Sequence, residues 1–71
     1  MKVFELAPRY DSRKSFYGKA HVIERDDGTL DLLSYDTIVS TCRKGVVKHL
    51  GKWSNTTSRH QKEFEKQFSI Y

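Results

Sequence analysis

The sequence predicts an α+β fold, in which an antiparallel β-meander of three to four strands carries one C-terminal amphipathic helix packed on a face. Between residues 15 and 50, short segments rich in β-branched and aromatic residues alternate with turn residues, which is typical of antiparallel hairpins. From residue 53 onward, apolar side chains instead recur every three to four residues, which is the period of a helix. A chain of 71 residues has room for one small core, so we expect a single domain over residues 1–71.

The first half of the chain predicts a hairpin preceded by a loop. Met1–Leu6 alternates weakly and could form a short edge strand, and Ala7–Lys14, with the only proline, is typical of a surface loop. Phe16–Glu24 is a stronger strand, because small or apolar residues occupy every second position. Arg25–Gly28 then supplies a turn, and Thr29–Tyr35 alternates as the returning strand.

The middle of the chain predicts a second hairpin. Thr37–Cys42 is dense in β-branched residues, Arg43–Gly45 supplies the turn, and Val46–Trp53 is the last strand. Ile38–Leu50 could also be drawn as a helix with an apolar stripe. We prefer the hairpin, because a glycine lies in the middle of this segment and β-branched residues are frequent in it.

The C-terminal helix carries one apolar stripe, formed by Thr57, His60, Phe64, Phe68 and Tyr71. A helix this short is marginal in water, so Phe64 and Phe68 are expected to pack on the sheet. Four hydroxyl residues are candidate N-caps, namely Ser54, Thr56, Thr57 and Ser58. We expect Thr56 or Thr57 to be the cap.

Basic residues gather in the second half of the chain. Residues 1–36 hold six lysines and arginines against seven acids, whereas residues 37–71 hold seven against two. No acid lies between Thr37 and Lys62, so this segment would attract polyanions, although an ordinary solvated cationic surface has the same composition. The candidate residues for binding nucleic acid or another anion are Arg43, Lys44, Lys48, Lys52, Arg59 and Lys62.

The sequence offers little catalytic or metal chemistry. No histidine pair has metal-ligand spacing, and a single cysteine excludes an internal disulfide and a cysteine-based zinc cage. Cys42 is expected to be a half-buried strand thiol, and His60 a packed, hydrogen-bonded histidine at the core edge. Ser54 or Thr57 with His60 and Asp36 could be drawn as a triad, but hydroxyls before a helix are far more often caps. We therefore expect no enzyme activity, no metal and no cofactor.

Three motifs carry a family resemblance. Ser15–Ala20 contains Phe-Tyr-x-Lys-Ala, Leu33–Val39 contains Ser-Tyr-x-Thr-x-Val, and Trp53–Phe64 follows aromatic-Ser-x-Thr-Thr-x-Arg-His-x-x-Glu-Phe. They resemble a family of small uncharacterised proteins from phages and mobile elements of Gram-positive bacteria. The third motif is the most specific, and Trp53 stands where that family has tyrosine. The resemblance implies a setting in the bacterial cytoplasm and no mechanism.

Aromatic residues near the basic segment leave two interpretations open. The start of the helix, with Lys52, Arg59 and Lys62 close by, would suit a phosphate. Exposed aromatic side chains on the sheet could stack on bases, and the candidates are Tyr17, Tyr35 and Trp53. Alternatively Tyr35 and Trp53 close the core under the helix, which we favour for Trp53.

Two functions are consistent with these observations. The first is a small non-enzymatic protein that binds nucleic acid through its basic surface. The second is a protein-binding inhibitor or modulator of a host factor that handles nucleic acid, such as a phage counter-defence or anti-CRISPR-type protein. No membrane partner is expected, because no spanning segment or signal peptide is visible. An exposed edge strand could pair two copies in a homodimer.

Overall fold

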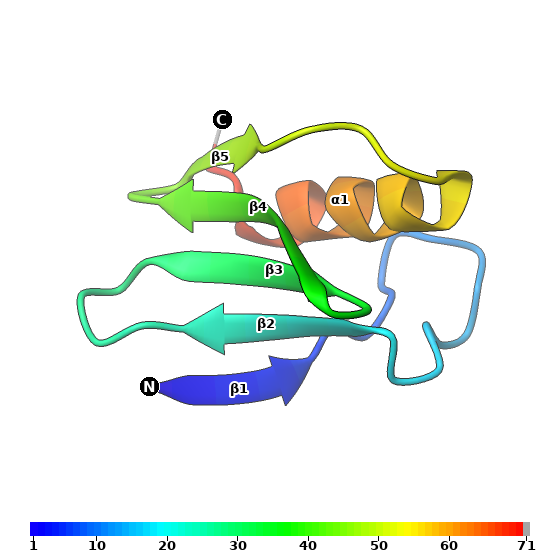
Figure 1. Cartoon of the computed structure of the whole chain (residues 1–71), viewed down its shortest axis with the longest axis horizontal. Coiled ribbons are helices and arrows are strands. Elements are labelled where there is room, and N and C mark those ends of the chain that lie inside the picture. The colour runs from blue at the N-terminus through cyan, green and yellow to red at the C-terminus, as the bar shows by residue number, and fades with distance from the viewer. Residues whose placement is uncertain (71) are drawn as a thin grey trace.

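The computed structural model, which describes residues 1–70, is a five-stranded antiparallel sheet with one helix on a face (Figure 1). The elements are β1 (Lys2–Glu5), β2 (Ala20–Glu24), β3 (Leu30–Ser34), β4 (Thr37–Arg43), β5 (Val46–His49) and α1 (Asn55–Phe68). Each strand pairs with the next in the order β1-β2-β3-β4-β5. The predicted α+β meander with a C-terminal helix is confirmed, but there are five strands where three to four were predicted. All four β1 residues are exposed, which explains why their hydrophobic alternation is weak.

The strand register decides which side chains face α1. Val22 pairs with Leu32, Leu32 with Ser40, and Ser40 with His49, so this row projects to one face of the sheet. The register between β3 and β4 shifts at Leu32, and the resulting irregularity leaves Val39 and Ser40 both buried. The Gln61 amide from α1 donates to the Val39 carbonyl at 3.0 Å and so ties the helix to this point.

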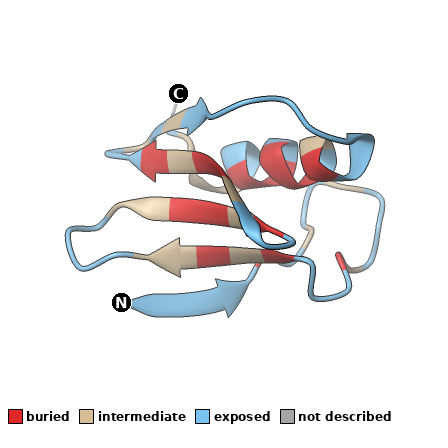
Figure 2. Cartoon of the chain, viewed as in Figure 1, coloured by how far each residue is buried: buried red, intermediate tan, exposed pale blue. Residues whose placement is uncertain are grey.

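The core lies between α1 and this face of the sheet (Figure 2). Its buried hydrophobic members are Leu6, Phe16, Ala20, Val22, Leu32, Val39, Cys42 and Phe64. Phe64 is fully buried, and the ring of Phe68 packs beside it with centroids 5.3 Å apart. The predicted anchoring of the helix by Phe64 is therefore confirmed, while Phe68 is only partly buried. The predicted stripe also included Tyr71, which lies outside the described residues.

The predicted strand Phe16–Glu24 begins only at Ala20 in the structure. Phe16 to Lys19 instead form a tight turn, in which the Lys19 N–H donates to the Phe16 carbonyl at 3.0 Å. Tyr17 and Gly18 both take positive φ, at 54° and 73°, which ends the extended conformation. Phe16 is still buried in the core, so its place in the apolar alternation was informative even though it is not in a strand.

The hairpin interpretation of Ile38–Leu50 is confirmed, and Lys44 and Gly45 form its turn with positive φ. The predicted last strand, however, ends at His49 and not at Trp53. Trp53 and Tyr35 are exposed, so the expectation that they close the core is wrong. Trp53 lies in the connection between β5 and α1, and its ring packs beside Gly51.

The N-cap of α1 is Ser54, not Thr56 or Thr57. Its Oγ accepts the Thr57 N–H at 3.2 Å. Thr57 cannot cap because it already lies within the first turn, where its side chain is buried against the sheet.

Candidate functional site

Three of the six predicted cations gather around the first half of α1. Lys52 and Lys62 line one surface depression, and the rest of its lining is His49, Gly51, Ser58, Gln61 and the acid Glu65. Arg59 and Lys62 line an adjoining depression. We call Lys52, Arg59 and Lys62 the α1 basic surface.

The other three predicted cations lie elsewhere. Arg43 and Lys44 are at the turn of the β4–β5 hairpin. Lys48 pairs with Thr41, one residue out of step with the Ser40–His49 pair that faces α1, so Lys48 projects to the opposite face of the sheet. Simple strand alternation would place Lys48 and Lys52 on one face, but β5 ends at His49, so the alternation does not continue to Lys52.

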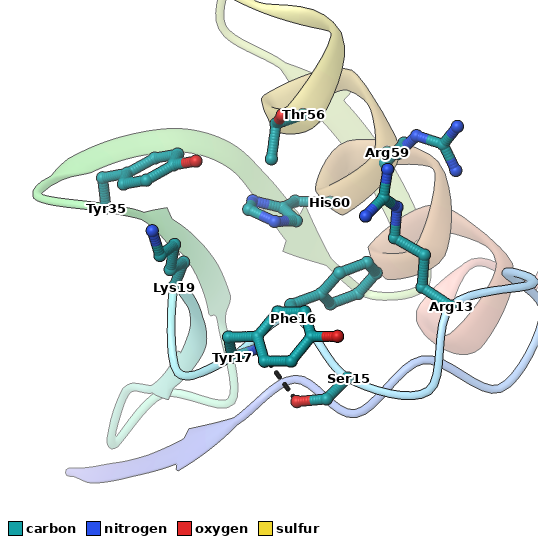
Figure 3. Close-up of a pocket in the computed structure, with 9 residues that line it drawn as sticks. All are labelled: Arg13, Ser15, Phe16, Tyr17, Lys19, Tyr35, Thr56, Arg59 and His60. Carbon is teal, nitrogen blue, oxygen red and sulfur yellow. Dashed lines mark hydrogen bonds between the residues drawn. The ribbon is translucent and has the colours of Figure 1, made fainter.

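A pocket of about 160 Å³ opens beside the α1 basic surface (Figure 3). We call it the His60 pocket, and its lining residues are Arg13, Ser15, Phe16, Tyr17, Lys19, Tyr35, Thr56, Arg59 and His60. Three of these are cations and none is an acid. Arg59 belongs to both the pocket and the α1 basic surface, so the two sites are continuous.

His60 projects from α1 into the pocket wall, between Phe16 and Tyr35 (Figure 3). Its ring contacts Phe16 edge-on at a centroid distance of 4.6 Å and lies 6.1 Å from Tyr35. As expected, it is buried and hydrogen-bonded, because its Nδ1 lies 2.9 Å from Ser34 Oγ. Burial lowers the pKa of the imidazole below its ordinary value of 6.5, although the nearby Asp11 carboxylate partly opposes this.

The second ring nitrogen of His60 has no hydrogen-bond partner in the described part of the chain. Among residues 1–70, Nε2 is the only buried side-chain nitrogen or oxygen without a hydrogen bond. Most buried polar atoms in proteins are paired, and those that are not often mark functional positions. This atom therefore distinguishes the His60 pocket from the other depressions on the surface.

Two tyrosines of the pocket have unusual backbone conformations. Tyr17 and Tyr35 have φ of 54° and 57°, in the left-handed region that bulky residues rarely occupy. Tyr35 begins the two-residue turn between β3 and β4, and Tyr17 begins the Tyr17–Gly18 turn before β2. Both side chains are exposed, at 75% for Tyr17 and 49% for Tyr35. The ammonium of Lys19 lies over the Tyr35 ring at 5.4 Å.

The loop between β1 and β2 brings Arg13 to the pocket. Asp11 accepts the Arg13 N–H at 2.9 Å and the Arg59 guanidinium at 3.3 Å, which fixes the loop to α1. The Arg13 N–H and the Arg59 cation lower the pKa of the Asp11 carboxyl. A second hydrogen bond joins this loop to α1, because the Tyr10 N–H donates to the buried Glu63 carboxylate at 2.9 Å.

Sequence comparison adds a family to this description. A profile of a family of unknown function, DUF8033, matches residues 4–70. The chain belongs to this family. No curated protein and no solved structure matches the chain. The family assigns no activity, so the chemistry of this DUF8033 protein has to be argued from its own residues.

The remaining candidate sites offer less to a ligand. Over residues 1–70, no cluster of histidine, cysteine and acidic side chains is placed to hold a metal ion, and no helix is both long and apolar enough to cross a membrane. Cys42 is buried in the core. The triad considered from the sequence is not assembled, because Asp36 lies in the exposed β3–β4 turn and accepts from the Thr37 hydroxyl.

Sequence reasoning missed most of the His60 pocket. Of its lining residues, the predicted binding set contained only Arg59, and Tyr17 and Tyr35 were named as stacking candidates. Arg13 and Lys19 were overlooked because they lie outside the acid-free segment. The Phe-Tyr-x-Lys-Ala and Ser-Tyr motifs were the available signal, since they contribute Phe16, Tyr17, Lys19 and Tyr35.

Proposed function

We propose that this protein is a non-enzymatic binder of single-stranded nucleic acid, which it contacts through the α1 basic surface and the His60 pocket. One observation carries the proposal: exposed aromatic rings and cations converge on a single pocket. Tyr17 and Tyr35 line it together with Arg13, Lys19 and Arg59. Proteins that hold single strands combine such features, because cations neutralise phosphates and aromatic rings stack on bases.

The exposed tyrosines favour a single strand over a duplex. A stacked base pair presents only its edges to a protein, whereas an unpaired base presents a face to an aromatic ring. Lys52 and Lys62 place two further cations beyond the pocket along α1, in depressions that Asp11 and Glu65 also line, and these two cations would contact the phosphates of the rest of the strand. The bacterial and phage setting of this activity stays a prediction from the motif resemblance.

A salt series with two matched charge reversals tests the proposal. Fluorescence anisotropy would measure the affinity for a labelled single strand and for the corresponding duplex. The first double variant, Lys52→Glu with Lys62→Glu, reverses two charges of the α1 basic surface. The second, Arg43→Glu with Lys48→Glu, changes the net charge of the protein by the same amount, but at the β4–β5 turn and on the sheet face away from α1. All four side chains are exposed, so neither double variant should unfold the protein.

We expect tighter binding to the single strand, with log affinity falling as log salt rises by about 0.7 for each phosphate neutralised. The Lys52/Lys62 reversal should weaken binding and flatten this salt dependence, while the Arg43/Lys48 reversal should have a much smaller effect. Equal losses in both variants would show that only net charge matters. No detectable binding by the unmodified protein would reject the proposed function.

A second candidate function has its own observation. On the sheet face away from α1, Val3 pairs with Ile23 and Leu33 pairs with Ile38, and none of the helices and strands described over residues 1–70 covers them. Val3 is 58% exposed and the other three are partly exposed. This face would suit a modulator of a host protein, which should bury roughly 1,200–2,000 Å² with its partner. If this face binds a host protein, the complex should survive nuclease treatment. Leu33→Lys should then abolish the complex, whereas the Lys52/Lys62 reversal should leave it intact.

A further inference from the structure

A chain of hydroxyl groups behind His60 favours one of the two tautomers of its ring. The Ser54 hydroxyl donates to Thr57 Oγ1 at 3.4 Å, Thr57 Oγ1 lies 3.0 Å from Ser34 Oγ, and Ser34 Oγ lies 2.9 Å from His60 Nδ1. If each hydroxyl donates to the next group, every hydrogen in the chain has an acceptor. If Ser34 instead donated to Thr57, the Thr57 hydroxyl would have to donate to Ser54 Oγ, against the direction in which that pair is oriented.

The favoured arrangement makes Nδ1 the acceptor and leaves the hydrogen of the neutral ring on Nε2. Burial lowers the pKa of His60, which keeps the imidazole neutral near pH 7. The Nε2–H is then a buried donor with no partner among residues 1–70. A ligand atom with a lone pair, such as a carbonyl oxygen, a ring nitrogen or a phosphate oxygen, would satisfy it once the exposed side chains around the ring move aside, because Nε2 has almost no exposed surface in this structure.

The surroundings of this donor favour a nucleobase over a phosphate. Phe16 and Tyr35 flank the imidazole, so its immediate neighbourhood is aromatic. A phosphate placed there would bring its charge against a neutral donor and two rings, and burying an incompletely paired charge is unfavourable. A base instead presents flat apolar faces and a few acceptor atoms, which matches an aromatic pocket with one oriented donor.

The cations are placed to hold the phosphates on either side of the base. Arg13, Lys19 and Arg59 are exposed side chains of the lining, whereas His60 is only 1% exposed. We infer that the His60 pocket takes one unstacked nucleotide of a single strand, with an acceptor atom of the base on His60 Nε2–H and the adjoining phosphates on these cations. The inference rests on the proposed function and adds to it a defined nucleotide subsite.

The experiment reads the imidazole directly in the unmodified protein. With ¹⁵N-labelled histidine, the Nε2–H resonance of His60 would be followed by NMR while a short thymidine oligonucleotide is added. The matched ligand is an abasic oligonucleotide of the same length, which keeps the phosphates and lacks the bases. His21 serves as the internal reference, because it lines neither the pocket nor the depressions of the α1 basic surface.

We expect the thymidine strand to shift the Nε2–H resonance of His60 and the abasic strand to leave it unchanged. The abasic strand should also bind roughly tenfold or more weakly, since it lacks the stacking contribution of its bases. Equal shifts with both strands would place a phosphate at the donor and overturn the inference. Tight thymidine binding with an unmoved resonance would also overturn it while leaving the proposed function intact. Absence of binding by both strands would reject both.

Variants of the two rings give an independent readout. Asparagine tolerates positive φ, so Tyr17→Asn and Tyr35→Asn remove the rings without demanding a new backbone. Tyr10→Asn is the matched control, because Tyr10 is similarly exposed, has ordinary φ and does not line the pocket. Each pocket variant should weaken thymidine binding about fivefold or more and abasic binding little. Losses of the same size for both strands would contradict base stacking.

Discussion

The backbone conformation of Tyr17 lowers the stability of the fold, while its exposed ring is proposed to bind nucleic acid. One substitution at Tyr17 can measure both effects. A non-glycine residue in the left-handed region carries a penalty of about 1–2 kcal/mol. Tyr17 has φ of 54° and a side chain that is 75% exposed, so the fold recovers little of this penalty by burying the ring. Its backbone N–H donates to Ser15 Oγ at 2.9 Å, a bond that any side chain at this position would keep (Figure 3).

Tyr17→Asn should therefore raise the free energy of unfolding by up to about 1 kcal/mol, because asparagine tolerates this region well. In a domain of this size that corresponds to a melting temperature roughly 4–8 °C higher. The same variant should lose about 1–3 kcal/mol of affinity for a single strand if the ring stacks on a base. Urea denaturation and anisotropy on the same preparation would measure the two changes.

The control is again Tyr10→Asn, where φ is ordinary and both changes should stay within about 0.5 kcal/mol. A stability loss larger than about 1 kcal/mol for Tyr17→Asn, with Tyr10→Asn unaffected, would show that the Tyr17 ring supports the fold. Unchanged affinity would show that the ring does not contact nucleic acid. Either result would refute the argument that this strained residue is retained for binding.

Three further predictions concern the helix. Phe64→Ala should lower the free energy of unfolding by about 3–5 kcal/mol, because the ring is fully buried; a melting temperature within a few degrees of the unmodified protein would contradict this. Ser54→Ala should cost about 1 kcal/mol by removing the N-cap acceptor, whereas Ser58→Ala should cost much less. The pKa of His60, measured from its ring proton shifts, should lie below 6.5. Because the unfolded chain then takes up this proton first, the His60 contribution to stability should decline as pH falls below about 6.5 and level off below the folded-state pKa.

The parts of the fold that depend on local sequence were predictable. The β2–β3 and β4–β5 hairpins follow from turn residues between alternating segments, and α1 follows from the spacing of its apolar residues. β1 has only a weak signal in the sequence, because it pairs with β2 across a long loop and buries none of its own side chains. The N-cap was misassigned because four neighbouring hydroxyl residues have the same local signal, and only the packing of Thr57 on Ser34 separates them.

The candidate site was less predictable, because long-range contacts assemble it. Asp11 holds Arg13 near Arg59 by accepting a hydrogen bond from each residue. The Phe16 ring contacts His60 because the chain turns tightly before β2. Positive φ at Tyr17 is not visible in a strand-like alternation, and an unpaired ring nitrogen has no sequence signal at all. Charge density located the α1 basic surface but could not place Lys48 on the other face of the sheet.

The central claim is that a single strand occupies the His60 pocket, and a backbone amide map by NMR tests it most directly. On addition of a thymidine oligonucleotide, the largest shifts should fall on Tyr17, Lys19, Tyr35 and the first half of α1. Shifts confined to the opposite sheet face, around Ile23 and Leu33, would contradict the claim and favour the protein-binding surface instead.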